Sequence, residues 1–305
     1  MRTQYDKIFV RNIEDILKNG TEYESRAVWE EDGSKAKCIK LFGLVNRYNS
    51  NYENEVPIGT IRKFPIKNCI DEILWIWQKK SNNTKDLRSH IWDAWADYNG
   101  SIGKAYGYQV GTKVRKVSHE EKQVDIAGKV YIEHVEYFAD QTDYVLHELK
   151  HNPFNRRILT NLYSVEDTSL MALEPCCYSC TWNVTNRNGV NYLNLLLNQR
   201  SQDMIVANNW NVFQYWILQN MFAHVSGLEV GELVHVIADA HIYDRHVDTA
   251  NHMLNLYYDN PFESNIDKPY IEFNHHDNFY DYILDDFVLK DYNFDEIIKN
   301  IPVAV

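Results

Sequence analysis

The stretches CYSCTWNVT (residues 177–185) and YLNLLLNQRS (residues 192–201) lie close together past the middle of the chain. Both are short runs rich in β-branched, aromatic and aliphatic residues, which predict two strands joined by a hairpin. A third such run, LVHVIADAHIY (residues 233–243), follows a predicted helix at about 210–226. The four elements together predict a layered protein built from strands and helices.

Further elements are predicted on both sides of this region. The sequence has no internal repeat, low-complexity segment or linker rich in Pro and Gly, so we expect one domain over residues 1–305. A polar, charged segment at about 111–138 is typical of a surface insertion. Strands and helices do not alternate regularly, which predicts a mixed α/β or α+β protein. Helices are predicted at residues 13–19, 69–80, 87–100 and 141–152, and strands at 38–45 and 156–164.

Local signals define the ends and faces of these helices. Gly20 ends the first helix, Asp140 can cap the start of the fourth, and Pro153 terminates it. The helix at about 210–226 presents a stripe of large apolar side chains at helical spacing, which we expect to be buried. This stripe consists of Tyr215, Leu218, Met221, Phe222 and Val225.

The composition argues against several classes of protein. A net charge of −12 argues against a nucleic-acid surface, which needs a basic stripe, so we expect no DNA partner. No run of about 18 apolar residues occurs, so we expect no membrane span. The first residues are charged and lack the apolar core of a secretory signal. Together with only five cysteines, this predicts a protein of the reducing cytoplasm.

Three of the five cysteines lie within residues 176–180 and could form a zinc site, a redox pair or a nucleophile's pocket. Cys177 and Cys180 form one C-x-x-C pair, but no second pair of ligands completes a zinc site. His241 and His246 are five residues apart, which is not the one-turn spacing of a helical metal pair. A redox pair is disfavoured because these cysteines lie in a predicted strand. We therefore expect no metal, and buried structural thiols at both positions.

Cys176 differs because it follows Pro175, where a loop enters a strand, so its thiol can face a cleft. Such a thiol needs cationic neighbours or hydrogen-bond donors that lower its pKa before it becomes a useful nucleophile. Arg200 ends the next predicted strand, 24 residues later, and a hairpin brings the two residues close. The residues alone leave two interpretations, a nucleophile and the more common structural cysteine.

An ordered set of motifs resembles the folate-dependent thymidylate synthases that use a cysteine nucleophile. Their order and spacing agree from residue 13 to residue 305, with insertions near 27–37 and 111–138. The resemblance implies an α+β fold with one large mixed β-sheet per subunit, flanking helices, and sheets packed across a homodimer. The motifs are DEILWIW (71–77), IWDAWADYNGSIGKAYGYQ (91–109), NPFNRRI (152–158), LEPCCYSCTWNV (173–184), LNQRSQD (197–203), the run at 208–246, and PVAV (302–305).

This resemblance implies reductive methylation of dUMP to dTMP, with 5,10-methylenetetrahydrofolate as the donor of one carbon and a hydride. Cys176 then adds to C6 of uracil, because a soft sulfur nucleophile suits conjugate addition. Glu72 matches the catalytic glutamate, and its apolar surroundings can raise its pKa towards neutral pH. On the residues alone, Glu72 is better explained as an acidic residue that favours the helix dipole. Arg200 and Tyr106 complete the implied catalytic group.

The resemblance also implies the contacts to dUMP. The amide of Asn211 offers an acceptor for uracil N3–H and a donor for O4, a pattern that cytosine reverses. His241 and Tyr243 resemble the contacts to the sugar hydroxyl, and strand alternation puts Ile242 on the opposite face. Without the resemblance, this pair would be interpreted as satisfied buried polar groups. The implied dUMP contacts are Arg26, Arg156, Arg157, Arg200, Ser201, Gln202, Asp203, Asn211, His241, Ile242 and Tyr243.

Arg156 and Arg157 match a pair that reaches across the dimer interface into the partner's site, so the resemblance implies a homodimer. Adjacent arginines are more often solvated surface charge, which is the alternative here. For the folate, the resemblance implies a pterin contact from Asp203 and an apolar wall from Ile91 and Trp92.

The apolar C-terminus, which includes Ala304 and Val305, is unusual for a free end. In the family that it resembles, this tail closes over the folate and excludes water. We therefore expect that removal of Val305 abolishes turnover while dUMP still binds.

The sequence departs from the family pattern at a few positions. Cys177 and Pro65 stand where many members have His, and Ala207 and Asn209 replace a Gly and a Pro. The nearest alternative function is a dUMP hydroxymethylase, which adds water instead of hydride, and the closing tail disfavours it. A second alternative is a catalytically silent relative that binds nucleotide or RNA, which the acidic charge and the intact set of site residues disfavour.

Overall fold

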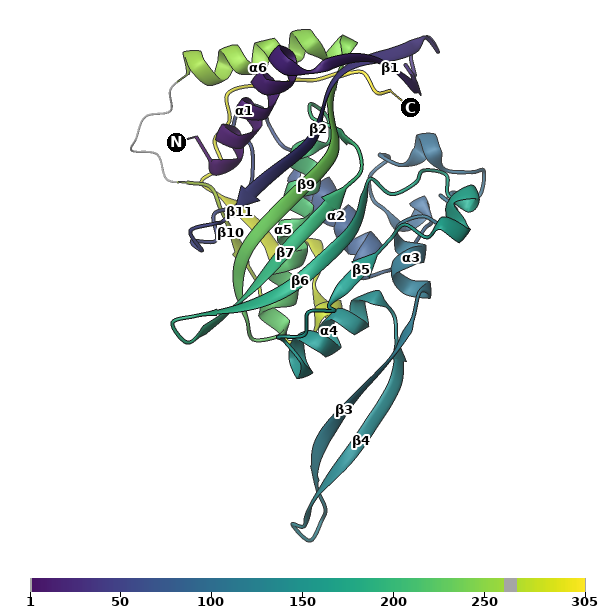
Figure 1. Cartoon of the computed structure of the whole chain (residues 1–305), viewed down its shortest axis with the longest axis vertical. Coiled ribbons are helices and arrows are strands. Elements are labelled where there is room, and N and C mark those ends of the chain that lie inside the picture. The colour runs from purple at the N-terminus through teal and green to yellow at the C-terminus, as the bar shows by residue number, and fades with distance from the viewer. Residues whose placement is uncertain (1, 261–267, 305) are drawn as a thin grey trace.

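The computed structural model describes residues 2–260 and 268–304 and is built around a seven-stranded sheet (Figure 1). The strand order is β1-β2-β9-β7-β6-β5, and the short β8 also pairs with β9. β7 and β8 run parallel to β9, and the other pairs are antiparallel, so the sheet is mixed. Its strands are β1 (Thr21–Val28), β2 (Lys35–Tyr48), β5 (Leu159–Asn161), β6 (Cys177–Arg187), β7 (Val190–Gln199), β8 (Gln202–Asp203) and β9 (Glu229–Tyr243).

Two helices, α2 and α5, pack against each other, and α5 lies on β7 and β9 of the sheet. The large rings of Trp77, Trp182 and Phe222 meet edge to face in this layer and are all fully buried. This arrangement confirms the predicted α+β class with one large mixed sheet and flanking helices. The helices are α1 (Gln4–Asn19), α2 (Ile66–Trp77), α3 (Gly107–Thr112), α4 (Gln141–His151), α5 (Asn208–Val225) and α6 (Val247–Asp259).

Several predicted helix ends agree with the structure. α1 ends at Asn19, before Gly20, but it begins nine residues earlier than predicted, where Thr3 and Asp6 form a capping box. The side chain of Asp140 accepts a hydrogen bond from the backbone N–H of Asp143 at 3.0 Å, so it caps α4 as predicted.

The helix predicted at residues 87–100 is wrong. This segment contains only a 3-10 turn at Asp93–Trp95. The carboxylate of Asp97 accepts hydrogen bonds from the backbone N–H groups of Asn99 and Ser101, which stabilises a turn in place of a helix. The indole of Trp92 donates instead to the buried carboxyl group of Glu72, so tertiary contacts override the helical pattern. The strand predicted at 156–164 is also shorter, since β5 covers only Leu159–Asn161.

The polar segment expected to form a surface insertion contains a hairpin of two ten-residue strands, β3 (Arg115–Val124) and β4 (Val130–Ala139). Figure 1 shows this hairpin extending well beyond the sheet, with α4 beside its base. β4 exposes large apolar side chains, among them Ile132 and Phe138. A second small sheet pairs β10 (Tyr270–Phe273) with β11 (Phe287–Lys290).

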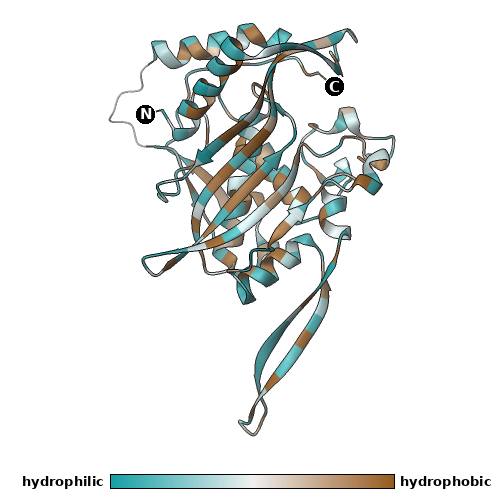
Figure 2. Cartoon of the chain, in the orientation of Figure 1, coloured by the Kyte–Doolittle hydropathy of each residue, from teal (hydrophilic) through white to brown (hydrophobic). Residues whose placement is uncertain are grey.

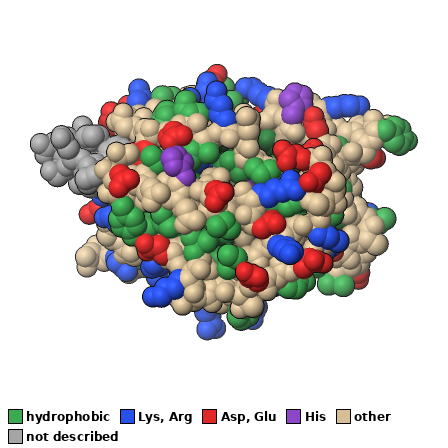
Figure 3. All heavy atoms as spheres, turned by 90° about the horizontal axis from the view of Figure 1, so that it is seen from above, with side chains coloured by type: hydrophobic (Ala, Val, Ile, Leu, Met, Phe, Trp, Pro, Cys, Tyr) green, Lys and Arg blue, Asp and Glu red, His purple; other side chains and the backbone are tan. Residues whose placement is uncertain are grey.

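The face of the large sheet opposite α5 is only partly covered. Figure 2 shows apolar residues along the strands on this side, and Val45 on β2 is 54% exposed. Charges of both signs are interspersed on the face seen in Figure 3, with no continuous basic surface there. No helix within the described ranges combines the length and apolarity that a membrane crossing requires.

We expect Trp182→Ala to lower the free energy of unfolding by about 3–5 kcal/mol, because it leaves a cavity between the sheet and α5. The control is Tyr98→Ala, which truncates an aromatic residue that is 95% exposed and should change stability by less than about 0.5 kcal/mol. Urea unfolding followed by fluorescence and circular dichroism measures both. Equal effects of the two substitutions would contradict the proposed role of this aromatic layer.

Candidate active site

A cleft of about 990 Å³ lies at the ends of β7 and β9, next to the first turn of α5. It collects side chains from β1, α2, the loops before α3 and β6, and the C-terminus. Most of the predicted site residues line it. They are Arg26, Glu72, Ile91, Trp92, Tyr106, Cys176, Arg200, Ser201, Gln202, Asp203, Asn211, His241, Tyr243 and Ala304.

Three predicted residues do not line this cleft. Arg156 and Arg157 are exposed in the loop between α4 and β5, so the chain does not bring them to its own cleft. Ile242 is completely buried on the opposite face of β9 from His241, as strand alternation predicts, and its contact to dUMP stays a prediction. Val305 lies outside the described residues.

Cys176 is partly exposed to the cleft, at the start of β6. Its backbone N–H donates to the hydroxyl of Tyr106 at 3.1 Å, and its carbonyl accepts from the backbone N–H of Arg200 at 2.9 Å. Burial raises the pKa of the thiol, while the charges of Arg200 and Arg26 act to lower it. The net direction is upward, so the two cations offset only part of the effect of burial on the thiol.

The guanidinium of Arg200 is fixed by the loop that precedes Cys176. Its Nε donates to the carbonyl of Pro175 at 3.1 Å, and its Nη2 donates to the carbonyl of Glu174 at 2.6 Å. The positive charge therefore stays beside the thiol, and other donor groups of the guanidinium remain for an anion.

Tyr106 shows backbone strain at the edge of the cleft. Its φ is 40° and its ψ is −99°, although it is neither Gly nor Asn. Such a conformation persists only when the surroundings impose it, and strained residues concentrate at functional sites. The strain directs the buried hydroxyl of Tyr106 towards the backbone of Cys176.

Glu72 lies on α2 with its carboxyl group buried at the floor of the cleft. It accepts hydrogen bonds from the indoles of Trp92 and Trp210 and from the amide of Gln214. Burial raises the pKa of Glu72, and the three hydrogen bonds only partly oppose this effect. A carboxyl group with a raised pKa can exchange protons with a ligand near neutral pH.

The amide oxygen of Asn211 is held by two glutamines. It accepts from Gln199 Nε2 at 3.1 Å and from Gln202 Nε2 at 3.4 Å. The oxygen of Gln199 in turn accepts from His235 Nε2 at 2.8 Å and from the thiol of Cys177 at 3.2 Å. Burial lowers the pKa of His235 to about 3, so the ring is neutral and its N–H fixes which way the amide of Gln199 points.

Sequence reasoning missed four of these supporting residues, namely Trp210, Gln214, Gln199 and His235. Gln199 and Gln214 carried a weak signal, because an amide in an otherwise apolar predicted element needs a partner. Trp210 and His235 carried none, since their partners Glu72 and Gln199 lie far away in the sequence.

A second polar group joins the ends of β8 and β9. His241 Nδ1 is 2.9 Å from a carboxylate oxygen of Asp239, and Tyr243 packs edge-on against the His241 ring. Burial by itself would raise the pKa of Asp203, but the ion pair that it forms with His246 at 3.6 Å outweighs burial and lowers this pKa. Asp203 therefore presents an ionised carboxylate beside the cleft.

The wall opposite the thiol is aromatic and apolar. The ring of Trp92 lies edge-on to Trp95 and to Tyr106, and Ile91 adjoins them at the cleft. The C-terminal tail reaches the same cleft, which Ala304 lines. Ala304 forms an isolated β-bridge with Trp29, the residue that follows β1. This places the tail at the mouth of the cleft.

The departures from the family pattern have different structural consequences. Pro65 is exposed at the N-cap of α2 and does not line the cleft. Cys177 is buried and donates to Gln199, and Cys180 is buried as well, as predicted for structural thiols. Asn209 replaces a proline and holds the neighbouring loop, because its amide bonds to the backbone of Pro57 and Gly59.

The cleft combines a thiol beside a fixed guanidinium, a buried carboxyl group and an amide held by hydrogen bonds. This combination is typical of enzymes that use a cysteine nucleophile on a small anionic substrate. Comparison with known proteins specifies which of these enzymes it resembles. The sequence profile described as thymidylate synthase matches residues 7–305, so the chain belongs to the thymidylate synthase family.

Named relatives agree over almost the whole chain. Thymidylate synthase 1 of Bacillus subtilis (strain 168) is 37% identical over 309 residues, which cover 99% of this chain and 100% of the relative. Thymidylate synthase of Bacillus licheniformis is 39% identical over 297 residues, or 95% of each chain. The solved structure of thermostable thymidylate synthase A from Bacillus subtilis is 36% identical, with a TM-score of 0.81 over 99% of this chain and 100% of that one. These comparisons give no support to the hydroxymethylase alternative.

We expect Arg200→Gln to raise the pKa of Cys176 further, because it removes the cation that most opposes burial. Alkylation by iodoacetamide requires the thiolate, so its rate at pH 8 should fall roughly three- to tenfold. Mass spectrometry of the modified Cys176 peptide over a pH series gives the rate. The control Arg187→Gln changes an exposed arginine that does not line the cleft and should leave the rate unchanged.

Proposed function

We propose that this chain is a thymidylate synthase, which converts dUMP to dTMP with 5,10-methylenetetrahydrofolate and releases dihydrofolate. The observation that carries the proposal is the convergence of Cys176, Glu72, Arg200 and Asn211 on one cleft from four separate parts of the chain. Each of these side chains performs a step that uracil methylation requires.

Cys176 is the proposed nucleophile. Its sulfur forms a bond to C6 of the uracil ring, and the electron pair of the C5–C6 double bond moves towards C5 and O4. Arg200 stabilises the thiolate by its charge and binds the phosphate of dUMP together with Ser201 and Arg26. The sulfur leaves again when the C5–C6 double bond re-forms.

Glu72 is the proposed proton carrier. Burial raises its pKa, which favours the protonated carboxyl group, so that it can supply a proton as charge develops on O4. Trp92, Trp210 and Gln214 hold it in place. Tyr106, bonded to the backbone of Cys176, is proposed to take part in the proton transfers at C5.

Asn211 is the proposed selector of the base. Its amide NH₂ donates to uracil O4, and its oxygen accepts from N3–H in place of the long contact from Gln202 at 3.4 Å. Gln199 keeps the amide in this orientation. His241 and Tyr243 are proposed to bind the sugar hydroxyl from the end of β9.

The remaining space in the cleft fits a reduced folate. Ile91, Trp92 and Trp95 offer an apolar wall for a flat ring, and the ionised Asp203 offers acceptors for its N–H groups. When bound, the folate supplies the one-carbon unit and the hydride. Ala304 and the end of the chain beyond it are proposed to close over the folate and exclude water.

We propose that the enzyme is a homodimer in which Arg156 and Arg157 bind the phosphate in the partner's cleft. Both side chains are exposed and lie outside the cleft of their own chain. A role in the partner's cleft explains why two adjacent arginines occur there in so acidic a chain. The partly covered sheet face gives the second copy a surface, because Val45 is exposed there beside the half-buried Val236 on the adjacent strand.

A cytoplasmic location is part of the same proposal, and five free thiols suit a reducing compartment.

The experiment that tests this function follows dihydrofolate formation at 340 nm with methylenetetrahydrofolate and either dUMP or dCMP. We expect turnover with dUMP alone, and none from Cys176→Ser. Consumption of nucleotide without dihydrofolate would indicate a hydroxymethylase. No reaction with either nucleotide would refute the proposal.

We expect Glu72→Gln to lower kcat by about 10²–10⁴-fold while the affinity for dUMP changes little, because the group acts on the proton and not on binding. Trp210→Phe removes a hydrogen bond that favours the ionised carboxyl group, so it should move the Glu72 ionisation in the kcat–pH profile to higher pH. Profiles of both variants check this. An unchanged profile in Trp210→Phe would mean that Glu72 does not control the rate.

Mixing two inactive variants tests the dimer. Arg157→Ala and Cys176→Ser are each expected to be nearly inactive, but a mixed dimer holds one site with an intact cysteine and an intact partner arginine. Random re-association should therefore restore roughly one quarter of the parent activity. If the mixture stays inactive although mixed dimers are detected, Arg157 acts within its own subunit or not at all.

A further inference from the structure

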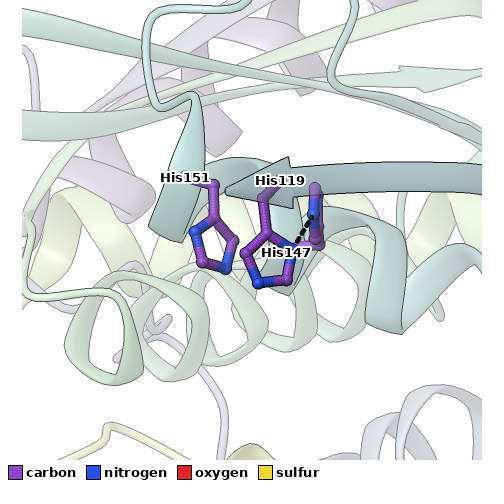
Figure 4. A group of neighbouring side chains, drawn as sticks. All are labelled: His119, His147 and His151. Atoms are coloured by element: carbon purple, nitrogen blue, oxygen red, sulfur yellow. Dashed lines mark hydrogen bonds between the residues drawn. The ribbon is translucent and has the colours of Figure 1, made fainter. Parts of the chain in front are cut away.

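Three histidines gather at the base of the β3–β4 hairpin, away from the cleft (Figure 4). His119 lies on β3, and His147 and His151 lie four residues apart in the last two turns of α4. One ring nitrogen from each lies within 4.8 Å of the others. No other group of three or more histidine, cysteine or carboxylate ligands comes together in this way within residues 2–260 and 268–304.

The spacing of these rings suits a metal ion. His119 Nδ1 and His147 Nε2 are 3.2 Å apart, and two imidazoles on a tetrahedral zinc ion with bonds of about 2.0–2.1 Å hold their nitrogens about 3.3 Å apart. The ring of His151 stacks on that of His119 with 3.9 Å between centroids. Its ligand nitrogen lies within 4.8 Å of the other two, so the His151 side chain has to move closer to them when an ion binds.

The far nitrogens of two rings face carboxylates. His119 Nε2 lies 2.7 Å from Glu121, and His147 Nδ1 lies 3.2 Å from Glu148. Histidines that bind metals commonly donate their second N–H to a carboxylate in this way, which fixes the tautomer and raises the basicity of the coordinating nitrogen. If both far nitrogens donate to these carboxylates, two lone pairs face each other between His119 Nδ1 and His147 Nε2, and either a metal ion or a proton between them removes the repulsion.

We propose that His119, His147 and His151 bind one divalent transition-metal ion, of which zinc is the best fit. Three imidazole ligands select zinc, copper or nickel over magnesium or calcium, and a four-coordinate site leaves one position for water. The ion joins the hairpin to α4. Without the ion, few contacts hold these two elements together. Glu148 continues the network to Asn155, next to Arg156 in the loop beyond α4.

A competition titration tests the site in the untagged full-length chain, stripped of metal with a chelator. The background is Cys176→Ser, so that the exposed thiol does not bind zinc. With a chromophoric zinc chelator as competitor, we expect one zinc ion per chain with a dissociation constant in the micromolar range or below. His119→Ala and His151→Ala should each weaken binding at least about tenfold.

The matched control is His134→Ala, which removes a 60% exposed histidine from β4 of the same hairpin and should leave zinc affinity unchanged. Cobalt provides a second readout, because a nitrogen-ligated tetrahedral site gives visible absorption without a thiolate charge-transfer band. Zinc should also raise the Tm of the parent but not of His151→Ala. The proposal would be overturned if the parent did not bind zinc, or if His119→Ala and His151→Ala bound zinc as tightly as the parent. In either case a shared proton would be the cation between the rings.

Discussion

The parallel pairing of β7 and β8 with β9 is the constraint on which the rest of the molecule depends. Parallel neighbours require a crossover, and α5 supplies it by packing its apolar surface on the same two strands. The ends of these strands and the start of α5 therefore meet at one edge of the sheet. Arg200, Asp203, Asn211 and His241 converge there although they come from the loop after β7, from β8, from α5 and from β9.

At this edge of the sheet, burial and nearby charges shift the pKa values of the site residues in opposite directions. A thiol and a carboxyl group buried side by side resist ionisation, and burial raises the pKa values of Cys176 and Glu72 alike. Arg200 opposes this effect at the thiol, while only neutral donors oppose it at the carboxyl group. The cations beside the thiol thus limit the rise of its pKa, while the carboxyl group has only neutral donors and keeps a raised pKa, and these are the conditions that favour a nucleophile and a proton carrier in a single cleft.

The supporting residues show how orientation passes from the core to the cleft. His235 is completely buried and neutral, and it fixes Gln199, which in turn fixes Asn211. Cys177 donates to the same Gln199, so a thiol is part of this network. The amide of Asn211 is held by a chain of hydrogen bonds that begins in the sheet.

The sequence by itself determined the elements with strong local signals. Strands β6, β7 and β9 and helices α4 and α5 follow from side-chain periodicity and caps, and the ordered motifs identified the family and most residues of the cleft. Tertiary structure decided the rest. The segment at 87–100 has a helical pattern but is held in turns by Asp97 and by the bond from Trp92 to Glu72. His147 and His151 show one-turn spacing in the sequence, but His119 joins them only because β3 folds back onto α4. Long-range contacts of this kind leave no periodicity in the chain, since they depend on which surfaces meet after the elements have formed.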